Sequence, residues 1–152
     1  MRGGRTVGGG NAGVSLQVCA CDWLKASQRL CPGAMIIKHP SPGDKILIFR
    51  PECLQLVLGG AKTLEIRGRP FRSGTYYLGS QSQIYAQAKL GRAFPIHTMR
   101  DFLRTKHQHR MGCTKLPYLK TFAIPILELS PMFVRYCHPR GAVTIARYRS
   151  CV

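Results

Sequence analysis

Three charged side chains and a hydroxyl lie within the six positions 62–67 of the chain: Lys62, Thr63, Glu65 and Arg67. Apolar and polar residues alternate from position 63 to 67, as in a half-buried strand, so Thr63, Glu65 and Arg67 share one strand face. Lys62 comes directly before that strand. An ammonium, a carboxylate and a guanidinium at one strand mouth would form a polar cleft for a phosphate or a nucleobase edge. The alternative is that this strand face is solvated and forms no site, in which case Glu65 and Arg67 only neutralise each other.

The carboxylate of this group has an expected positioning role. Glu65 is expected to hold one cationic neighbour, which leaves the other cation for a ligand. No catalytic set is expected; Lys62 is a candidate only if the protein is an enzyme, because an uncharged lysine amine can activate a nucleophile. The sequence contains no Walker loop, H-E-x-x-H or G-x-S-x-G motif, so those chemistries are not indicated. We expect no cofactor.

The seven cysteines follow the spacing of neither a zinc site nor a disulfide framework. Their number is odd, they are scattered, and no C-x-x-C pair occurs. We expect free thiols in a reducing compartment, mostly in packing roles. His107, His109 and Cys113 could converge on a metal, but a His-x-His pair in a basic helix is expected to be solvated. No metal site is therefore predicted.

The segment before the charged group predicts a strand and a short helix. Residues 45–49 are apolar and rich in isoleucine, as in a buried strand. Pro51 suits the first turn of a helix, where its missing N–H has no partner to lose. A Gly-Gly pair at 59–60 provides a left-handed stop, after which the chain enters the strand at 63–67. This turn would deliver Lys62 to the mouth of that strand.

The rest of the chain predicts one long helix and four more strands. The helix is expected at 99–111, with Thr98 as its N-cap and Gly112 at its C-terminal stop. Pro125 marks an edge strand or a bulge. The strands are expected at 75–78, 84–90, 122–129 and 142–148. Together these elements indicate an α+β domain that closes a small barrel.

Residues 1–43 are expected to form a flexible extension, and residues 44–152 the folded domain. The first 13 residues hold six glycines, and Pro and Gly recur between positions 32 and 43, as in a linker. Arg2 and Arg5 precede a moderately apolar segment, so targeting to an organelle is one expectation. The other is an intracellular protein of the cytoplasm or nucleus.

Charge predicts a polyanionic partner. The chain has 23 Lys and Arg against 6 Asp and Glu, a formal net charge of +17, and the expected domain holds 18 against 5. Such a surface favours nucleic acid, and a barrel cleft suits the splayed bases of single-stranded RNA. No run of about 20 apolar residues occurs, which excludes an integral membrane protein. We expect no membrane partner, and we expect a monomer. The expected basic surface comprises Arg69, Arg72, Arg100, Arg104, Lys106, Arg110, Arg147 and Arg149.

The motif around Lys62 resembles the G-x-K-T-x-E-x-R signature of ASCH domains, members of the PUA-like superfamily. Residues 60–67 carry the motif, Arg50-Pro51 resembles the family's opening segment, and the resemblance extends over about residues 45–149. It implies a PUA-like β-barrel of five or six strands, flanked by two or more helices, with a cleft over the motif strand. It also implies RNA binding, recognition of modified bases or, in some members, enzymatic activity.

One bacterial branch of that superfamily deacylates N4-acetylcytidine with a Lys, a Thr and a Glu. Lys62 matches its lysine, but Glu65 stands at the position of its threonine, and its distal glutamate has no counterpart. We therefore hypothesise an RNA-binding protein, or one that binds a nucleobase-like ligand, through a cleft lined by Lys62, Thr63, Glu65 and Arg67. The alternatives are an enzyme of the same fold, amidohydrolase or ribonuclease-like, and a coactivator or protein-interaction module.

Overall fold

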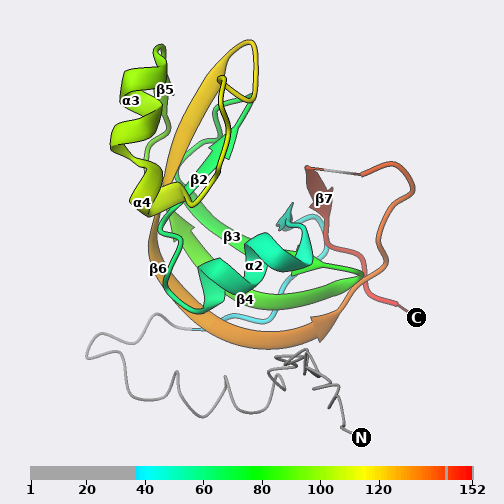
Figure 1. Cartoon of the computed structure of the whole chain (residues 1–152). Helices are drawn as coiled ribbons and strands as arrows, with labels where there is room; N and C mark the ends of the chain where they lie inside the picture. Colours follow the sequence, from blue (N-terminus) through cyan, green and yellow to red (C-terminus); the bar gives the residue numbers. More distant parts are fainter. Residues whose placement is uncertain (1–36, 143, 152) are drawn as a thin grey trace, which may run out of the picture. The chain divides into compact units, whose positions relative to one another are not determined.

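The computed structural model describes residues 37–142 and 144–151 (Figure 1). Most of the expected flexible extension, residues 1–36, lies outside the described residues. No helix in the described ranges is long and apolar enough to cross a bilayer. The elements, in chain order, are β1 (Lys45–Ile48), α2 (Pro51–Leu58), β2 (Leu64–Arg67), β3 (Gly74–Ser80), β4 (Gln83–Leu90), β5 (Phe94–Ile96), α3 (Met99–Arg104), α4 (Lys106–His109), β6 (Thr121–Arg135) and β7 (Ile145–Arg147).

The strands form one curled, mixed sheet, a half-barrel with helices beside it (Figure 1). Their order is β2-β6-β4-β3-β1-β7, and β5 pairs with β6 off this path. The β1–β3 pair is parallel, and the other pairs are antiparallel. The expected α+β fold, a small barrel flanked by helices, is confirmed, with seven strands in the described part of the chain instead of five or six.

The long strand β6 has two register shifts against β4, each near a proline. Pro125 pairs with Leu64 of β2, and the register with β4 shifts near it. Pro131 lies at a second register shift, opposite Ala86. Proline cannot donate to a ladder, so bulges are where a paired strand tolerates it. The bulge expected at Pro125 lies two residues later, at Leu127, between the pairs Lys89–Glu128 and Leu90–Ile126.

The helices close two separate apolar cores. Leu54 and Val57 of α2 are buried in the concave side of the sheet, in one cluster with Leu47 and Leu78. Phe102 of α3 is buried in another cluster that includes Leu64 and Ile66 of β2. The expected strand and helix at 45–58 are confirmed, with Pro51 opening the helix and Gly60 at φ +76° beyond its end.

The long helix expected at 99–111 is wrong in length and in its stop. Thr98 caps it as expected, accepting from the Asp101 N–H at 3.2 Å, but α3 ends at Arg104 and α4 begins at Lys106. The left-handed stop is Arg110, at φ +60°, and not Gly112. Strand β5 was not predicted, because its three residues include a proline and show no alternation.

Strand bounds elsewhere follow the expectation with shifts. The hairpin β3–β4 turns through Gln81 and Ser82, both at positive φ, as a two-residue turn of type I′ requires. Strand β6 is longer than expected and β7 shorter.

The end of the expected extension contacts the sheet. Tyr77 Oη donates to the Lys38 carbonyl at 2.9 Å, and the Lys38 N–H donates to Gln87 Oε1 at 3.3 Å. Pro40 is buried, and the Gly43 N–H donates to the Tyr148 carbonyl at 3.1 Å. The domain boundary at position 44 stays a prediction, but chain contacts with the sheet already begin at position 38.

Candidate functional site

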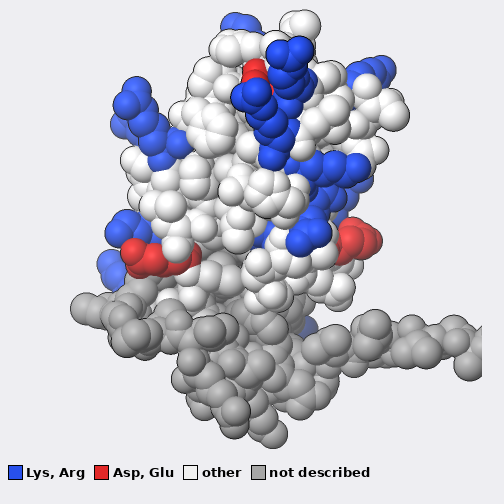
Figure 2. Space-filling view, turned by 60° about the vertical axis from the view of Figure 1, so that its left-hand side comes forward, with Lys and Arg blue, Asp and Glu red and all other residues white. Residues whose placement is uncertain are grey.

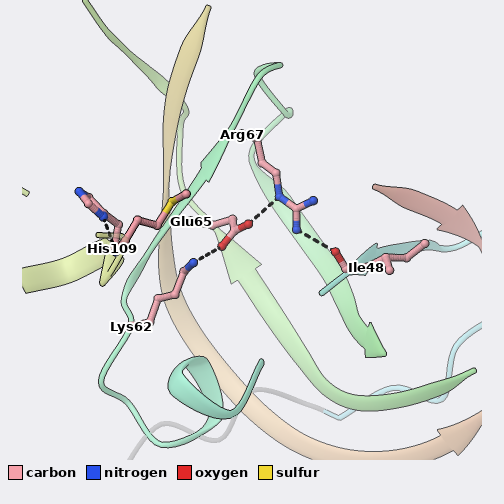
Figure 3. A network of polar contacts seen from close by, with 6 residues as sticks. Ile48, Lys62, Glu65, Arg67 and His109 are labelled. Atoms are coloured by element: carbon pink, nitrogen blue, oxygen red, sulfur yellow. Dashed lines mark hydrogen bonds and ion pairs between the residues drawn. The ribbon is translucent and has the colours of Figure 1, made fainter. Parts of the chain in front are cut away.

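A carboxylate with a cation on each oxygen lies at the centre of the site. Glu65 Oε2 is 2.8 Å from Lys62 Nζ, and Glu65 Oε1 is 2.6 Å from Arg67 Nε (Figure 3). The side chains of Lys62 and Glu65 are 3% and 6% exposed, and that of Arg67 is 12% exposed. Two cations and one anion leave a net charge of +1 in a nearly buried group.

The alternation of β2 sends these side chains to one face. Leu64 and Ile66 point into the apolar cluster around Phe102, so Glu65 and Arg67 point the other way. The turn before the strand is hydrogen-bonded to two helices, α2 and α4. The Lys62 N–H donates to the Leu56 carbonyl at 2.9 Å, and the Thr63 N–H donates to the Gln108 backbone carbonyl at 3.0 Å.

Arg67 connects two strands that share no ladder. Its Nη2 donates to the Ile48 carbonyl at 2.8 Å, at the end of β1, and its guanidinium lies over the Phe49 ring at 5.2 Å (Figure 3). Because β1 pairs with β3 and β7 while β2 pairs with β6, this side chain bridges the open side of the half-barrel.

The expectation that Glu65 leaves one cation free is wrong, because each of its oxygens contacts a different cation. Glu65 is also buried, which excludes the solvated-face alternative for this strand. Thr63 is exposed and does not line the cavity described next. Lys62, Glu65 and Arg67 do come together as the sequence indicated.

A cavity of about 540 Å³ lies against this group. Its walls come from the end of β1 with Arg50, from β2 with Lys62, and from Tyr118 and the segment before β7. Tyr118 is 42% exposed, and its ring lies against Gly68, just beyond β2. Sequence reasoning did not assign Arg50 and Tyr118 to the site; they reach it through the curvature of the sheet, although Arg50 directly follows the predicted first strand.

His109 is buried behind the site, so its expected solvation is wrong. Its ring stacks on Phe102 at 4.2 Å, Nε2 donates to the Phe102 carbonyl at 2.9 Å, and Nδ1 accepts from the Met111 N–H at 3.0 Å. Both ring nitrogens are therefore engaged, which leaves none for a metal, and no group of three metal-ligating side chains occurs among the residues described.

Burial lowers the pKa of His109 below its usual 6.5, because the charged ring would lose its hydration. The hydrogen bond to Phe102 opposes this effect. The nearby charges of Lys62 and Lys106, together with His107, lower the pKa further. The neutral ring is therefore the form that the fold holds.

The expected basic surface residues are all exposed, on three different parts of the fold. Two lie after β2, four on or beside α3 and α4, and two at the C-terminal end. Ion pairs in the described ranges involve only Lys62, Arg67 and Lys89, so none of these eight has a carboxylate partner there. Figure 2 shows Lys and Arg spread over one face with few acids among them.

Comparisons with known proteins identify the fold. No family model and no curated protein matches the sequence. The structure resembles the crystal structure of a mutant of the ASCH protein ZmASCH from Zymomonas mobilis, with a TM-score of 0.58. The match covers 73% of this chain and 92% of that chain, at 13% sequence identity. The chain therefore has the fold of an ASCH domain, as the motif at 60–67 implied.

Proposed function

We propose that this protein is an ASCH-domain protein that binds single-stranded RNA, with a base in the cavity beside Lys62 and the phosphates on the exposed arginines. The observation that carries the proposal is the cation-rich cavity. Its volume of about 540 Å³ falls within the range of small-molecule sites, and its wall contains a net positive group.

The lining of the cavity offers the contacts that a nucleobase uses. Lys62 and Arg67 carry N–H donors beyond those given to Glu65 and Ile48, so they can donate to carbonyl or ring-nitrogen acceptors. Tyr118 presents a half-exposed ring, on which a base can stack with little regard to sequence. Arg50 at the cavity and Arg69 beyond β2 are exposed cations for the backbone.

Binding is favoured over hydrolysis by the contacts of Glu65, the only carboxylate among the described residues that line the cavity. Each Glu65 oxygen lies within ion-pair distance of a cation, Lys62 for Oε2 and Arg67 for Oε1. These contacts give the carboxylate the role of positioning the two cations. The Lys62 amine is directed at Glu65, at 2.8 Å, which favours a role in binding over one in proton transfer.

The test is a pair of lysine variants measured for affinity to a single-stranded RNA. Lys62→Met removes the ammonium but keeps the buried stem packed, and Arg67 still pairs with Glu65. We expect RNA affinity to fall by about 1 to 3 kcal/mol, the contribution of a charged hydrogen-bond donor. Lys89→Met is the matched control, because Lys89 is also paired with a glutamate, Glu128, but is exposed and outside the cavity.

Equal affinities for Lys62→Met and the parent protein would argue against the cavity as the binding site. If RNA binding were then lost in the double variant Arg100→Ala with Arg104→Ala, the surface of α3 would be the RNA-binding surface and the cavity a structural feature.

A further inference from the structure

Two cysteines near the C-terminus have their sulfur atoms in contact. Cys137 Sγ and Cys151 Sγ are 3.2 Å apart, with the Cys137 thiol donating. Both residues are exposed, so the expected packing role is wrong for this pair. Cys53 and Cys113, by contrast, are partly buried against apolar clusters, as a packing role requires. The pair lies outside the cavity and takes no part in the proposed RNA binding.

The backbone holds the two thiols close together. The Cys137 N–H donates to the Arg149 carbonyl at 2.9 Å, and the preceding Tyr136 is fully buried. A disulfide needs about 2.05 Å between the sulfurs, so the remaining approach is roughly 1 Å. Rotation of two exposed side chains can supply a movement of that size without a change in the sheet.

The contact between the two thiols also changes the ionisation of Cys151. The hydrogen bond with Cys137, and after it desolvation, raises the pKa of the Cys151 thiol. A negative charge on Cys137 raises it further, while the nearby Arg135 lowers it. Because the thiolate is the nucleophile in thiol oxidation, the raised pKa makes the reaction faster as the pH increases.

We propose that Cys137 and Cys151 form a redox modification site, a dithiol that a hydroperoxide converts into a disulfide. One thiolate attacks the terminal peroxide oxygen, the O–O bond breaks, and a sulfenic acid forms as the alcohol, or water from hydrogen peroxide, leaves. The second thiol attacks the sulfenic sulfur, the S–S bond forms, and water leaves. The two thiols thus lose two electrons and two protons to the peroxide.

The disulfide would restrain one wall of the cavity. Its two cysteines are 14 positions apart, and the chain between them contains β7 together with Ala142 and Thr144, which line the cavity. Strand β7 is only three residues long and pairs with β1 alone. A covalent link across this segment would limit its opening, and an exposed disulfide stays accessible to reductants.

Peptide mapping of the full chain tests the proposal. The reduced protein is treated briefly with hydrogen peroxide, its remaining thiols are alkylated, and it is cut with trypsin. Cleavage at the arginines releases Cys137 in residues 136–140 and Cys151 in residues 150–152, so their disulfide gives one linked product of unique mass. We expect this product to dominate and to disappear with dithiothreitol. Its absence, or equal linkage of Cys137 to several other cysteines, would overturn the proposal.

Two variants separate this pair from the other thiols. Cys151→Ser is expected to lose the linked product and to leave a sulfenic acid on Cys137 that dimedone traps, whereas Cys113→Ser is expected to keep the product. Oxidation is expected to raise the Tm of the parent by about 5 to 10 °C, because a short loop is closed in the unfolded chain. An equal rise in Cys151→Ser would overturn the proposal.

Discussion

Glu65 holds two cations at once, and removal of its charge would leave both without a counter-ion in a nearly buried place. We predict that Glu65→Gln, which keeps the size of the side chain, lowers the free energy of unfolding by about 3 to 5 kcal/mol. Urea unfolding of the variant and the parent protein measures this difference.

The matched control for that variant is Glu128→Gln. Glu128 is also paired with a lysine, Lys89, at 3.1 Å, but the two side chains are 47% and 52% exposed. Water screens such a pair, so the expected loss is under about 1 kcal/mol. Similar losses in the two variants would mean that the Glu65 group does not behave as a buried ion pair.

Residue types and local spacing were sufficient to predict that Lys62, Glu65 and Arg67 come together, because alternation along a strand is a local property. The contact of Arg67 with β1 could not be predicted from local spacing. Its hydrogen bond to the Ile48 carbonyl joins residues 19 positions apart, and the curvature of the whole sheet brings them together. The burial of His109 was missed for the same reason, since it depends on packing against Phe102.

At the scale of elements, α4 connects a buried histidine to the start of the motif strand. The Gln108 backbone carbonyl accepts from the Thr63 N–H at 3.0 Å. The Arg110 side chain, just after α4, donates from Nε to the Ala61 carbonyl at 2.9 Å. His109 between them is held neutral, because burial lowers its pKa. The turn that carries Lys62 is therefore hydrogen-bonded to both neighbours of His109.

We predict that stability falls as the pH decreases below about 6.5. In the unfolded chain His109 takes up a proton near its usual pKa of 6.5, whereas in the folded protein its pKa is lower. The unfolded state thus binds more protons in this window, so the contribution is complete above pH 6.5 and is lost toward the lower folded pKa. Urea unfolding at pH 7.5, 6.5 and 5.5 measures it.

Two histidine variants isolate the source of that pH dependence. His109→Gln is expected to flatten the change between pH 7.5 and 5.5, and His107→Gln, an exposed position on the same helix, is expected to keep it. A change in His109→Gln as large as in the parent protein would assign the dependence to another group.

Gly60 lies in the turn before β2, in a backbone conformation that other residues disfavour. Its φ is +76°, and a Cβ atom at this position would have no neighbour within 4 Å, so Gly60→Ala would meet no clash but would strain the backbone. We predict a loss of about 1 to 2 kcal/mol in unfolding free energy. Gly112→Ala, also in open space but without a positive φ, is expected to cost nothing. Equal effects would show that the turn tolerates side chains.

Elements with strong periodicity were predictable, and those defined by packing were not. Strands β1 to β4 and helix α2 lie where their patterns indicate. The helix break at Thr105 was not predictable from spacing, because it depends on that side chain bonding back to the Phe102 carbonyl at 3.1 Å and on His109 turning inward. Strand β5 owes its pairing to β6 rather than to its own sequence.

At the scale of the molecule, charge and fold together define the expected partner. The chain carries a net charge of +17, and in the described ranges few of its cations are paired with acids. Composition alone predicted a polyanionic partner, and the motif predicted the fold. Neither composition nor the motif could predict the open half-barrel and the cavity at its open side, because both follow from the order of all the strands.

The most direct test of RNA binding is the salt dependence of affinity for a short single-stranded RNA. Each phosphate neutralised by the protein releases counter-ions, so log K against log salt concentration has a slope of about −0.7 per phosphate. Contacts from the cavity and the exposed arginines together are expected to give a slope of about −2 or steeper, with weaker binding to the same sequence as a duplex. A flat slope, or no measurable binding at low salt, would contradict the proposal that this protein binds RNA.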